Sequence, residues 1–191
     1  MKNLSSIVAD FMHGVASGRI EIYNEFSLQH ELGIFLREQW PVYKIQFERN
    51  VSHFSSGVTK KSFTKREIDI VATHPDHTDL QCAIELKFPR RGQYPEQMFS
   101  FCKDIAFAEE LHAIGFTQTA FIAVADDPLF YSGASEGIYA FFRGARPLSG
   151  QVHKPTGAKN DSVTIKGTYR IDWQNIAGSM RYALVTVGNC P

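Results

Sequence analysis

The sequence predicts an α/β fold in which a mixed central sheet is flanked by helices. Some segments carry apolar residues at helical spacing, and others alternate apolar and polar residues as a half-buried strand does. From residue 25 to residue 125 their order is helix, three strands, helix, strand, and extra strands are expected toward the C-terminus. A chain of 191 residues with 43% hydrophobic content can bury one sizeable core, so we expect a single domain over residues 1–191.

Two helices are expected before the first strand. An amphipathic helix over residues 4–16 is interrupted by polar residues, so it is not expected to be a signal peptide. Its apolar stripe is Leu4, Ile7, Val8, Phe11, Met12 and Val15. The core itself begins with a helix from Phe26 to Trp40, which Pro41 ends. The stripe of this second helix is Leu28, Leu32, Phe35 and Leu36.

The remaining elements follow in order. Val42 to Val51 alternates as a strand, and the next two strands form a hairpin around the polar loop 74–79. A helix begins at Pro95 and ends near Gly115, and the continuous apolar run 121–125 is typical of a buried strand. In the C-terminal extension, residues 130–191, we expect a long surface loop over 144–161 and strands over 163–171 and 182–187.

The hairpin brings two acids together. Residues two apart on a strand share a face, so Glu85 and Lys87 point the same way. If the hairpin is symmetric about His77, Asp69 lies directly opposite Glu85, with Cβ atoms about 5 Å apart. Like charges so placed repel, and a divalent cation between them would convert the repulsion into binding. Lys87 beside that cation could hold a phosphate or position a water.

This pattern resembles the PD-(D/E)XK nuclease superfamily, with Asp69 as the first acid and Glu85-Leu86-Lys87 as the E-x-K element. Ile68 stands where the motif often has a proline. The resemblance spans residues 25–125 and implies a restriction-endonuclease-like core, αβββαβ, that hydrolyses phosphodiester bonds, most of all in DNA. It also implies that Mg²⁺ is held by Asp69, Glu85 and the Leu86 carbonyl; Mn²⁺ should substitute, because the ligands are hard oxygens.

Two further catalytic residues are implied by the resemblance. The superfamily often carries a glutamate on its first helix, and Glu31 is the best match, although Glu25 and Glu38 lie on the same helix. Glu31 would bind a second metal ion or a metal-bound water. Gln97 resembles the glutamine of a Q-x-x-x-Y element, with Phe101 in place of the tyrosine.

Basic residues close to these motifs are candidates for phosphate contact, because bases beside hydroxyls suit a nucleic-acid backbone. The loop between the first two strands contributes most of them, and a pair of arginines follows Lys87. The predicted nucleic-acid contacts are Lys60, Lys61, Lys65, Arg66, Arg90 and Arg91. Lys and Arg together number 20, as do Asp and Glu, so any basic face must come from an uneven distribution of charge.

Two other function classes stay open: a non-catalytic nucleic-acid or protein binding module on the same fold, and a metal-dependent enzyme that acts on a small phosphate compound. The intact Asp69, Glu85 and Lys87 argue against the first, and the lack of a nucleotide-binding loop argues against the second. The three cysteines show no pattern that suggests disulfide pairing, which suits a reducing cytoplasm. No stretch approaches the ~20 apolar residues of a membrane span. Since one site cuts one strand, duplex cleavage would favour a homodimer.

Overall fold

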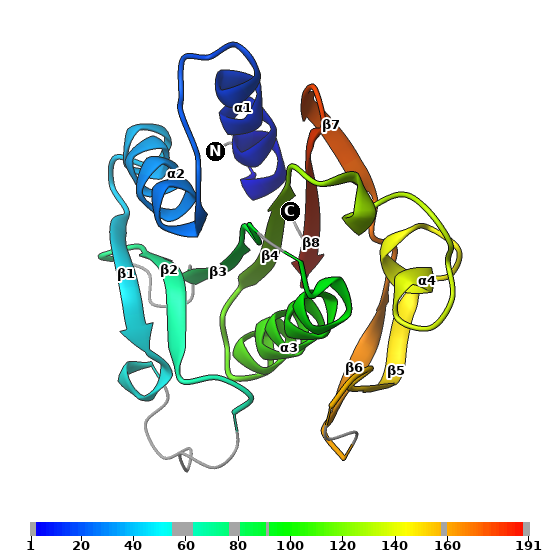
Figure 1. The fold of residues 1–191 in the computed structure, drawn as a ribbon. Helices are drawn as coiled ribbons and strands as arrows, with labels where there is room; N and C mark the ends of the chain where they lie inside the picture. Colours follow the sequence, from blue (N-terminus) through cyan, green and yellow to red (C-terminus); the bar gives the residue numbers. More distant parts are fainter. Residues whose placement is uncertain (1–2, 55–62, 77–80, 91, 158–159, 189–191) are drawn as a thin grey trace.

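A mixed six-stranded sheet with helices on both faces organises the molecule, and a two-stranded ribbon lies beside it (Figure 1). The structure is a computed structural model that describes residues 3–54, 63–76, 81–90, 92–157 and 160–188. Its mixed sheet and flanking helices confirm the predicted α/β class.

The helices and strands follow one another in the order that the sequence predicts for residues 25–125. The elements of that region are α2 (Glu25–Gln39), β1 (Lys44–Asn50), β2 (Glu67–Thr73), β3 (Gln81–Lys87), α3 (Tyr94–Ala113) and β4 (Gln118–Ala125). Before them lies α1 (Leu4–Ala16), and after them come α4 (Tyr139–Phe142), β5 (Leu148–His153), β6 (Ser162–Tyr169), β7 (Trp173–Ala177) and β8 (Met180–Val187). Short 3-10 turns occupy η1 (Val51–His53) and η2 (Pro128–Phe130).

The strand order of the large sheet is β1-β2-β3-β4-β8-β7. Only β3 and β4 run parallel, and α3 makes the crossover that a parallel pair requires. In the β2–β3 hairpin, Ile70 pairs with Ile84 and Val71 with Ala83. The same register places Asp69 opposite Glu85, so the predicted symmetry of the hairpin is confirmed.

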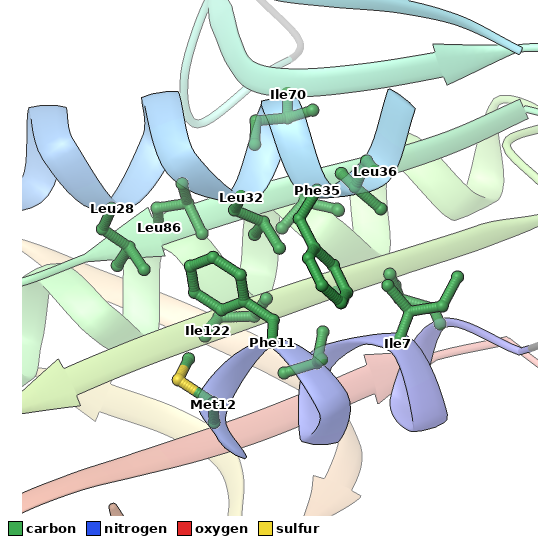
Figure 2. Close-up of a cluster of buried hydrophobic side chains, with 14 of the residues drawn as sticks. Ile7, Phe11, Met12, Leu28, Leu32, Phe35, Leu36, Ile70, Leu86 and Ile122 are labelled. Atoms are coloured by element: carbon green, nitrogen blue, oxygen red, sulfur yellow. The ribbon is translucent and has the colours of Figure 1, made fainter. Parts of the chain in front are cut away.

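Helices α1 and α2 cover one face of the sheet. Figure 2 shows Phe11 of α1 and Leu32 of α2 packed among Ile70, Leu86 and Ile122 from three neighbouring strands. All five side chains are fully buried, which removes them from water and supplies the main driving force for this layer. The face of β3 that carries Leu86 is therefore the core face, and its alternate residues must point to the other side of the sheet.

Helix α3 covers that other side and is itself covered by β5, β6 and α4. Phe101 and Phe142 meet between α3 and α4, with ring centroids 5.6 Å apart. Buried Glu109 fastens α3 to β6, since its carboxylate accepts hydrogen bonds from the Lys166 and Gly167 N–H groups and from the Tyr169 hydroxyl, at 2.6–2.9 Å. Although α3 has 20 residues, no helix in the described ranges is both long enough and apolar enough to cross a bilayer.

The predicted surface loop over residues 144–161 is wrong, because β5 runs through it. Only Leu148 and Val152 of this strand are apolar, and both are buried under α3, while the residues between them are exposed. Apolar residues four apart do not show the alternation by which a strand is recognised. The short elements α4 and β7 also went unpredicted, whereas β6 and β8 lie where strands were expected.

The Glu109→Ala substitution is expected to lower the free energy of unfolding by about 2–3 kcal/mol, because buried donors left without an acceptor are costly. Chemical denaturation measures the change. The exposed Glu136→Ala variant is the control and should stay within about 0.5 kcal/mol of the wild type. Equal stabilities of the two variants would show that Glu109 does not fasten β6 to α3.

Candidate functional site

Charged side chains from four parts of the chain meet on the α3 side of the sheet. β2 and β3 contribute Asp69, Glu85 and Lys87, α3 contributes Asp104, and Lys65 enters from the segment before β2. Glu85 is 0% exposed and Asp104 is 1% exposed. Carboxylates are almost never buried to this degree unless they are paired, so the cluster must be held together by its own countercharges.

The Lys65 ammonium lies at the centre of the acids. Its Nζ atom pairs with Glu85, lies 2.9 Å from Asp104 Oδ1 and lies 4.0 Å from Asp69 Oδ1. The sequence predicts Lys65 as a phosphate contact, and the structure instead directs it to these carboxylates. The reason is electrostatic, since buried acids attract the nearest flexible cation.

Lys87 lies on the same side of the sheet, as the strand parity predicts. Its Nζ atom is 3.1 Å from Glu25 Oε1 and 3.5 Å from Asp104 Oδ2, and it donates to the Leu86 carbonyl at 2.8 Å. Leu86 and Phe88 pack into the core on the opposite face. The ammonium of Lys87 is therefore held from both sides, by the start of α2 and by the middle of α3.

Side-chain hydrogen bonds link β2 to β3 where their regular pairing ends. Asp69 Oδ2 accepts from the Leu86 N–H at 2.7 Å, and the Asp69 N–H donates to Glu85 Oε1 at 3.4 Å. These bonds fix both carboxylates relative to the backbone. Their mutual position therefore depends on the hairpin register and much less on side-chain freedom.

Burial shapes the protonation of the cluster. It raises the pKa of Asp69 from 3.8 to about 6, although Lys65 and the Leu86 N–H pull the pKa down. Burial and the neighbouring Asp69 charge raise the pKa of Glu85 well above its ordinary value, and burial also raises the pKa of Asp104. Burial would lower the pKa of Lys65, but the charges of Glu85 and Asp104 outweigh it and raise that pKa. The acids thus hold their protons more tightly than exposed carboxylic acids do, chiefly because they are buried.

Glu31 does not join this cluster. It interacts with His30 at 3.3 Å and lines a separate cavity of about 540 Å³ between α1 and α2. The glutamate that reaches the cluster is Glu25, which contacts Lys87 and accepts from the Phe88 N–H at 3.2 Å. Six residues at about 100° each place Glu31 about 120° away from Glu25 around the helix, so the two cannot serve one site.

Helix α3 brings Asp104, which was not predicted, to the cluster, whereas no hydrogen bond or ion pair of the described residues joins the predicted Gln97 to it. Gln97 lies in its first turn, and Asp104, seven residues later, lies on the same helix face because seven residues make nearly two turns. Sequence reasoning missed Asp104. Its signal was a charged residue between Phe101 and Ile105, inside the apolar stripe of the helix.

The other predicted phosphate contacts have different surroundings. Lys60, Lys61 and Arg91 lie outside the described residues. Arg66 is exposed just before β2. Arg90 pairs with Asp126 at 2.6 Å and lies 5.0 Å from the ring centre of Phe88, at the end of β3.

A cavity of about 290 Å³ opens beside Asp69 on the α2 side, with Glu25, Gln29 and Glu48 in its lining. Gln29 Nε2 donates to Glu48 Oε1 at 2.6 Å and to the Asp69 carbonyl at 2.9 Å. Glu48 has a φ of 49°, which is strained for a residue other than glycine and turns its side chain toward α2. Strain of this kind gathers at functional sites, and sequence patterns give no sign of it.

The oxygen atoms around Asp69 set how an ion could bind. Within the described ranges, no three His, Cys, Asp or Glu side chains are grouped so as to hold a metal ion by themselves. A hard cation would therefore take the Asp69 and Glu85 carboxylates and complete its shell with backbone oxygen, water or a substrate phosphate. Mg²⁺ is commonly bound in this way.

Comparison with known proteins finds no matching family model, no matching curated protein and no matching solved structure. The resemblance to the PD-(D/E)XK superfamily therefore remains a prediction. Its support is the geometry around Asp69, Glu85 and Lys87.

The stability of the wild type, relative to Asp69→Asn, is expected to fall as the pH rises from about 5 to about 7.5. The folded chain holds the Asp69 proton more tightly than the unfolded chain does, so this stabilisation is complete below about pH 4 and is lost through about pH 6. Denaturation in EDTA should show a relative loss on the order of 1–2 kcal/mol. Asp172→Asn, at an exposed position, is the control, and parallel pH profiles for all three proteins would contradict the effect.

Proposed function

We propose that the protein is a metal-dependent phosphodiesterase of the PD-(D/E)XK type that cleaves DNA. The observation that carries the proposal is the pair Asp69 and Glu85, opposite each other on β2 and β3, with Lys87 two residues further on the same face. The element order α2-β1-β2-β3-α3-β4 and the parallel β3–β4 pair support a restriction-endonuclease-like core.

The donor atoms fit a hard divalent cation. Glu25, Asp69, Glu85 and Asp104 bring four carboxylates, against the two ammonium groups of Lys65 and Lys87. Fully ionised, the cluster is two positive charges short, which a divalent cation would supply. Asp69, Glu85 and the Leu86 carbonyl would hold Mg²⁺, which when bound lowers the pKa of water and offsets charge on a phosphate.

The protein's own groups position the remaining participants. Glu25 and Asp104 hold Lys87 and raise its pKa against the effect of burial, so it stays protonated. A protonated amine cannot accept a proton from water, but it can stabilise the charge that develops on the phosphate. In that step the water oxygen loses its proton to solvent as it bonds to phosphorus, and the ester oxygen leaves and takes up a proton from solvent. We therefore assign Lys87 to the phosphate and Glu25 and Asp104 to positioning Lys87.

One observation favours a second candidate, a binding module without catalysis. The Lys65 ammonium pairs directly with Glu85 and Asp104, as in a purely structural ion network. In the nuclease proposal the same contact means that Lys65 competes with the metal. The two candidates therefore differ in what removal of the Lys65 charge does.

Wild-type protein is expected to nick supercoiled plasmid in Mg²⁺ and to stop in EDTA. Asp69→Asn, Glu85→Gln and Lys87→Met should each reduce the rate by about 10²–10³-fold, because each removes a group that acts on the reacting phosphate or its metal. Gel analysis of plasmid and of single-stranded circular DNA measures the rate. DNA binding without any cleavage would favour the binding module, and a rate unchanged by Lys87→Met would refute the assignment of this site.

Glu25→Gln and Glu31→Gln form a matched pair in the same assay. Both remove one charge from α2, but only Glu25 contacts Lys87. Glu25→Gln should slow cleavage, whereas Glu31→Gln should leave it at the wild-type rate. If Glu31→Gln slows cleavage and Glu25→Gln does not, Glu31 is the catalytic residue, as the sequence predicts.

Lys65→Met is expected to tighten Mn²⁺ binding by about tenfold, because a nearby positive charge that repels the ion is removed. Calorimetric titration gives the dissociation constant, and the melting temperature at saturating Mn²⁺ gives an independent readout through mass action. Lys44→Met, on the exposed side of β1, is the control. If Lys65→Met binds Mn²⁺ no better than the wild type, Lys65 does not compete with the metal.

A further inference from the structure

A second hollow, of about 430 Å³, lies among the loop after β4, α4 and the strands β7 and β8. Its lining combines the aromatic rings of Tyr131 and Trp173 with the guanidinium groups of Arg143 and Arg181, and Asp172 is its one carboxylate. Flat aromatic faces beside a cation form a surface on which a base can stack while a phosphate is neutralised.

The two rings are held rigidly by their polar ends. The Tyr131 hydroxyl donates to the Ser179 carbonyl at 2.6 Å, and the Trp173 indole N–H donates to the Phe142 carbonyl at 2.9 Å. Their centroids are 5.9 Å apart with the planes inclined by 50°. Because both polar ends are already bonded within the protein, the rings can offer a ligand only the parts of their apolar faces that Arg181 and the core leave uncovered.

The two arginines have different tasks. Arg143 donates to the carbonyls of Ala134 and Leu129 and lies over the Tyr139 ring, so it holds the loop in place. Arg181 lies 4.7 Å from the Tyr131 ring centre, and among the described residues no carboxylate lies within ion-pair distance of it. The exposed Asp172 is instead partnered by Arg170 at 3.3 Å. Arg181 is thus a cation whose charge is available to a phosphate.

The hollow and the Asp69–Glu85 site lie at the same end of the strands and on the same face of the sheet. Lys87 is paired with Ala123 of β4, and Arg181 is paired with Ala125 of the same strand. Neighbouring strands are about 4.8 Å apart, so β3 and β8, on either side of β4, are separated by roughly 10 Å. Because side chains alternate along β8, Arg181 lies on the same face of the sheet as Ala183, which packs against α3. Lys87 lies on that face too, since it contacts Asp104 of α3.

We propose that this hollow binds one unpaired nucleotide of a DNA strand whose scissile phosphate lies at Lys87. The base stacks on Trp173, and the adjoining phosphate pairs with Arg181, which lies over the Tyr131 ring. A base inside a duplex has both faces covered by its neighbours, so only a single-stranded region, a flap or an overhang can supply the occupant. That the bound DNA strand is also the substrate rests on the proposed function, whereas its binding in the hollow does not require cleavage.

Trp173 can report the binding directly. The chain has two tryptophans, and Trp40, at the C-terminal end of α2, is 4% exposed in the core. In a Trp40→Phe background, fluorescence titrations in EDTA would compare a 12-nucleotide oligothymidylate, a 12-base-pair duplex and thymidine monophosphate. We expect the single strand to quench Trp173 and to bind about tenfold more tightly than the duplex or the mononucleotide.

Arg181→Gln should weaken single-strand binding by about tenfold and flatten its salt dependence, because one phosphate contact is lost. Arg146→Gln is the matched control, since Arg146 also lies over an aromatic ring, that of Phe141, but outside the hollow. Circular dichroism verifies that both variants fold.

Equal quenching by duplex and single strand, or equal affinities of Arg181→Gln and Arg146→Gln, would overturn the proposal. Binding of thymidine monophosphate as tight as that of the oligonucleotide would show a free-nucleotide site instead and would overturn it as well. Because EDTA prevents cleavage, these outcomes are independent of the plasmid assay. A protein that cuts but does not quench loses only this inference, and one that quenches but does not cut loses only the nuclease proposal.

Discussion

The burial of Glu85 is the constraint on which the arrangement of the site depends. A carboxylate in the middle of a sheet, covered by a helix, is costly unless countercharge surrounds it. Lys65 is drawn in from the segment before β2, and Asp104 of α3 then connects Lys65 to Lys87. Lys87 in turn attracts Glu25 at the start of α2. One buried charge thus orders side chains from both helical layers and from the segment leading into the hairpin.

The C-terminal extension stabilises this arrangement from behind. α3 presents Asp104 to the sheet, and Glu109, five residues later, faces away and accepts three hydrogen bonds from β6. Five residues turn the helix by about 500°, so the two acids point in clearly different directions. The extension therefore fixes the rotation of α3, and through it the position of Asp104 against Lys65 and Lys87. A residue far from the charged cluster can in this way affect the orientation of Lys87.

Sequence patterns predict what depends on local periodicity. Strand alternation and a symmetric hairpin are enough to place Asp69 opposite Glu85, and the observed register agrees. They cannot decide whether Glu25 or Glu31 joins the charged cluster, because that depends on which side of α2 faces the end of β3. Nor do they reveal Lys65, whose pairing with Glu85 spans twenty residues and forms only when the fold is complete. The strained Glu48 likewise reflects a backbone conformation that composition does not encode.

The sign of the charge at the site bears on how a polyanion could approach it. A cluster in which Glu25, Asp69, Glu85 and Asp104 outnumber the two lysines repels a phosphodiester, so the neutral net charge of the chain gives no assistance there. A divalent cation would reverse this local repulsion as well as supply the chemistry. Before a cation binds, affinity for the DNA strand must come from elsewhere, and Arg181 is placed to provide it. Arg181 lies at the same end of the sheet and has no carboxylate partner among the described residues. Strand binding and metal binding would then be separable steps, carried by different residues on one face of the sheet.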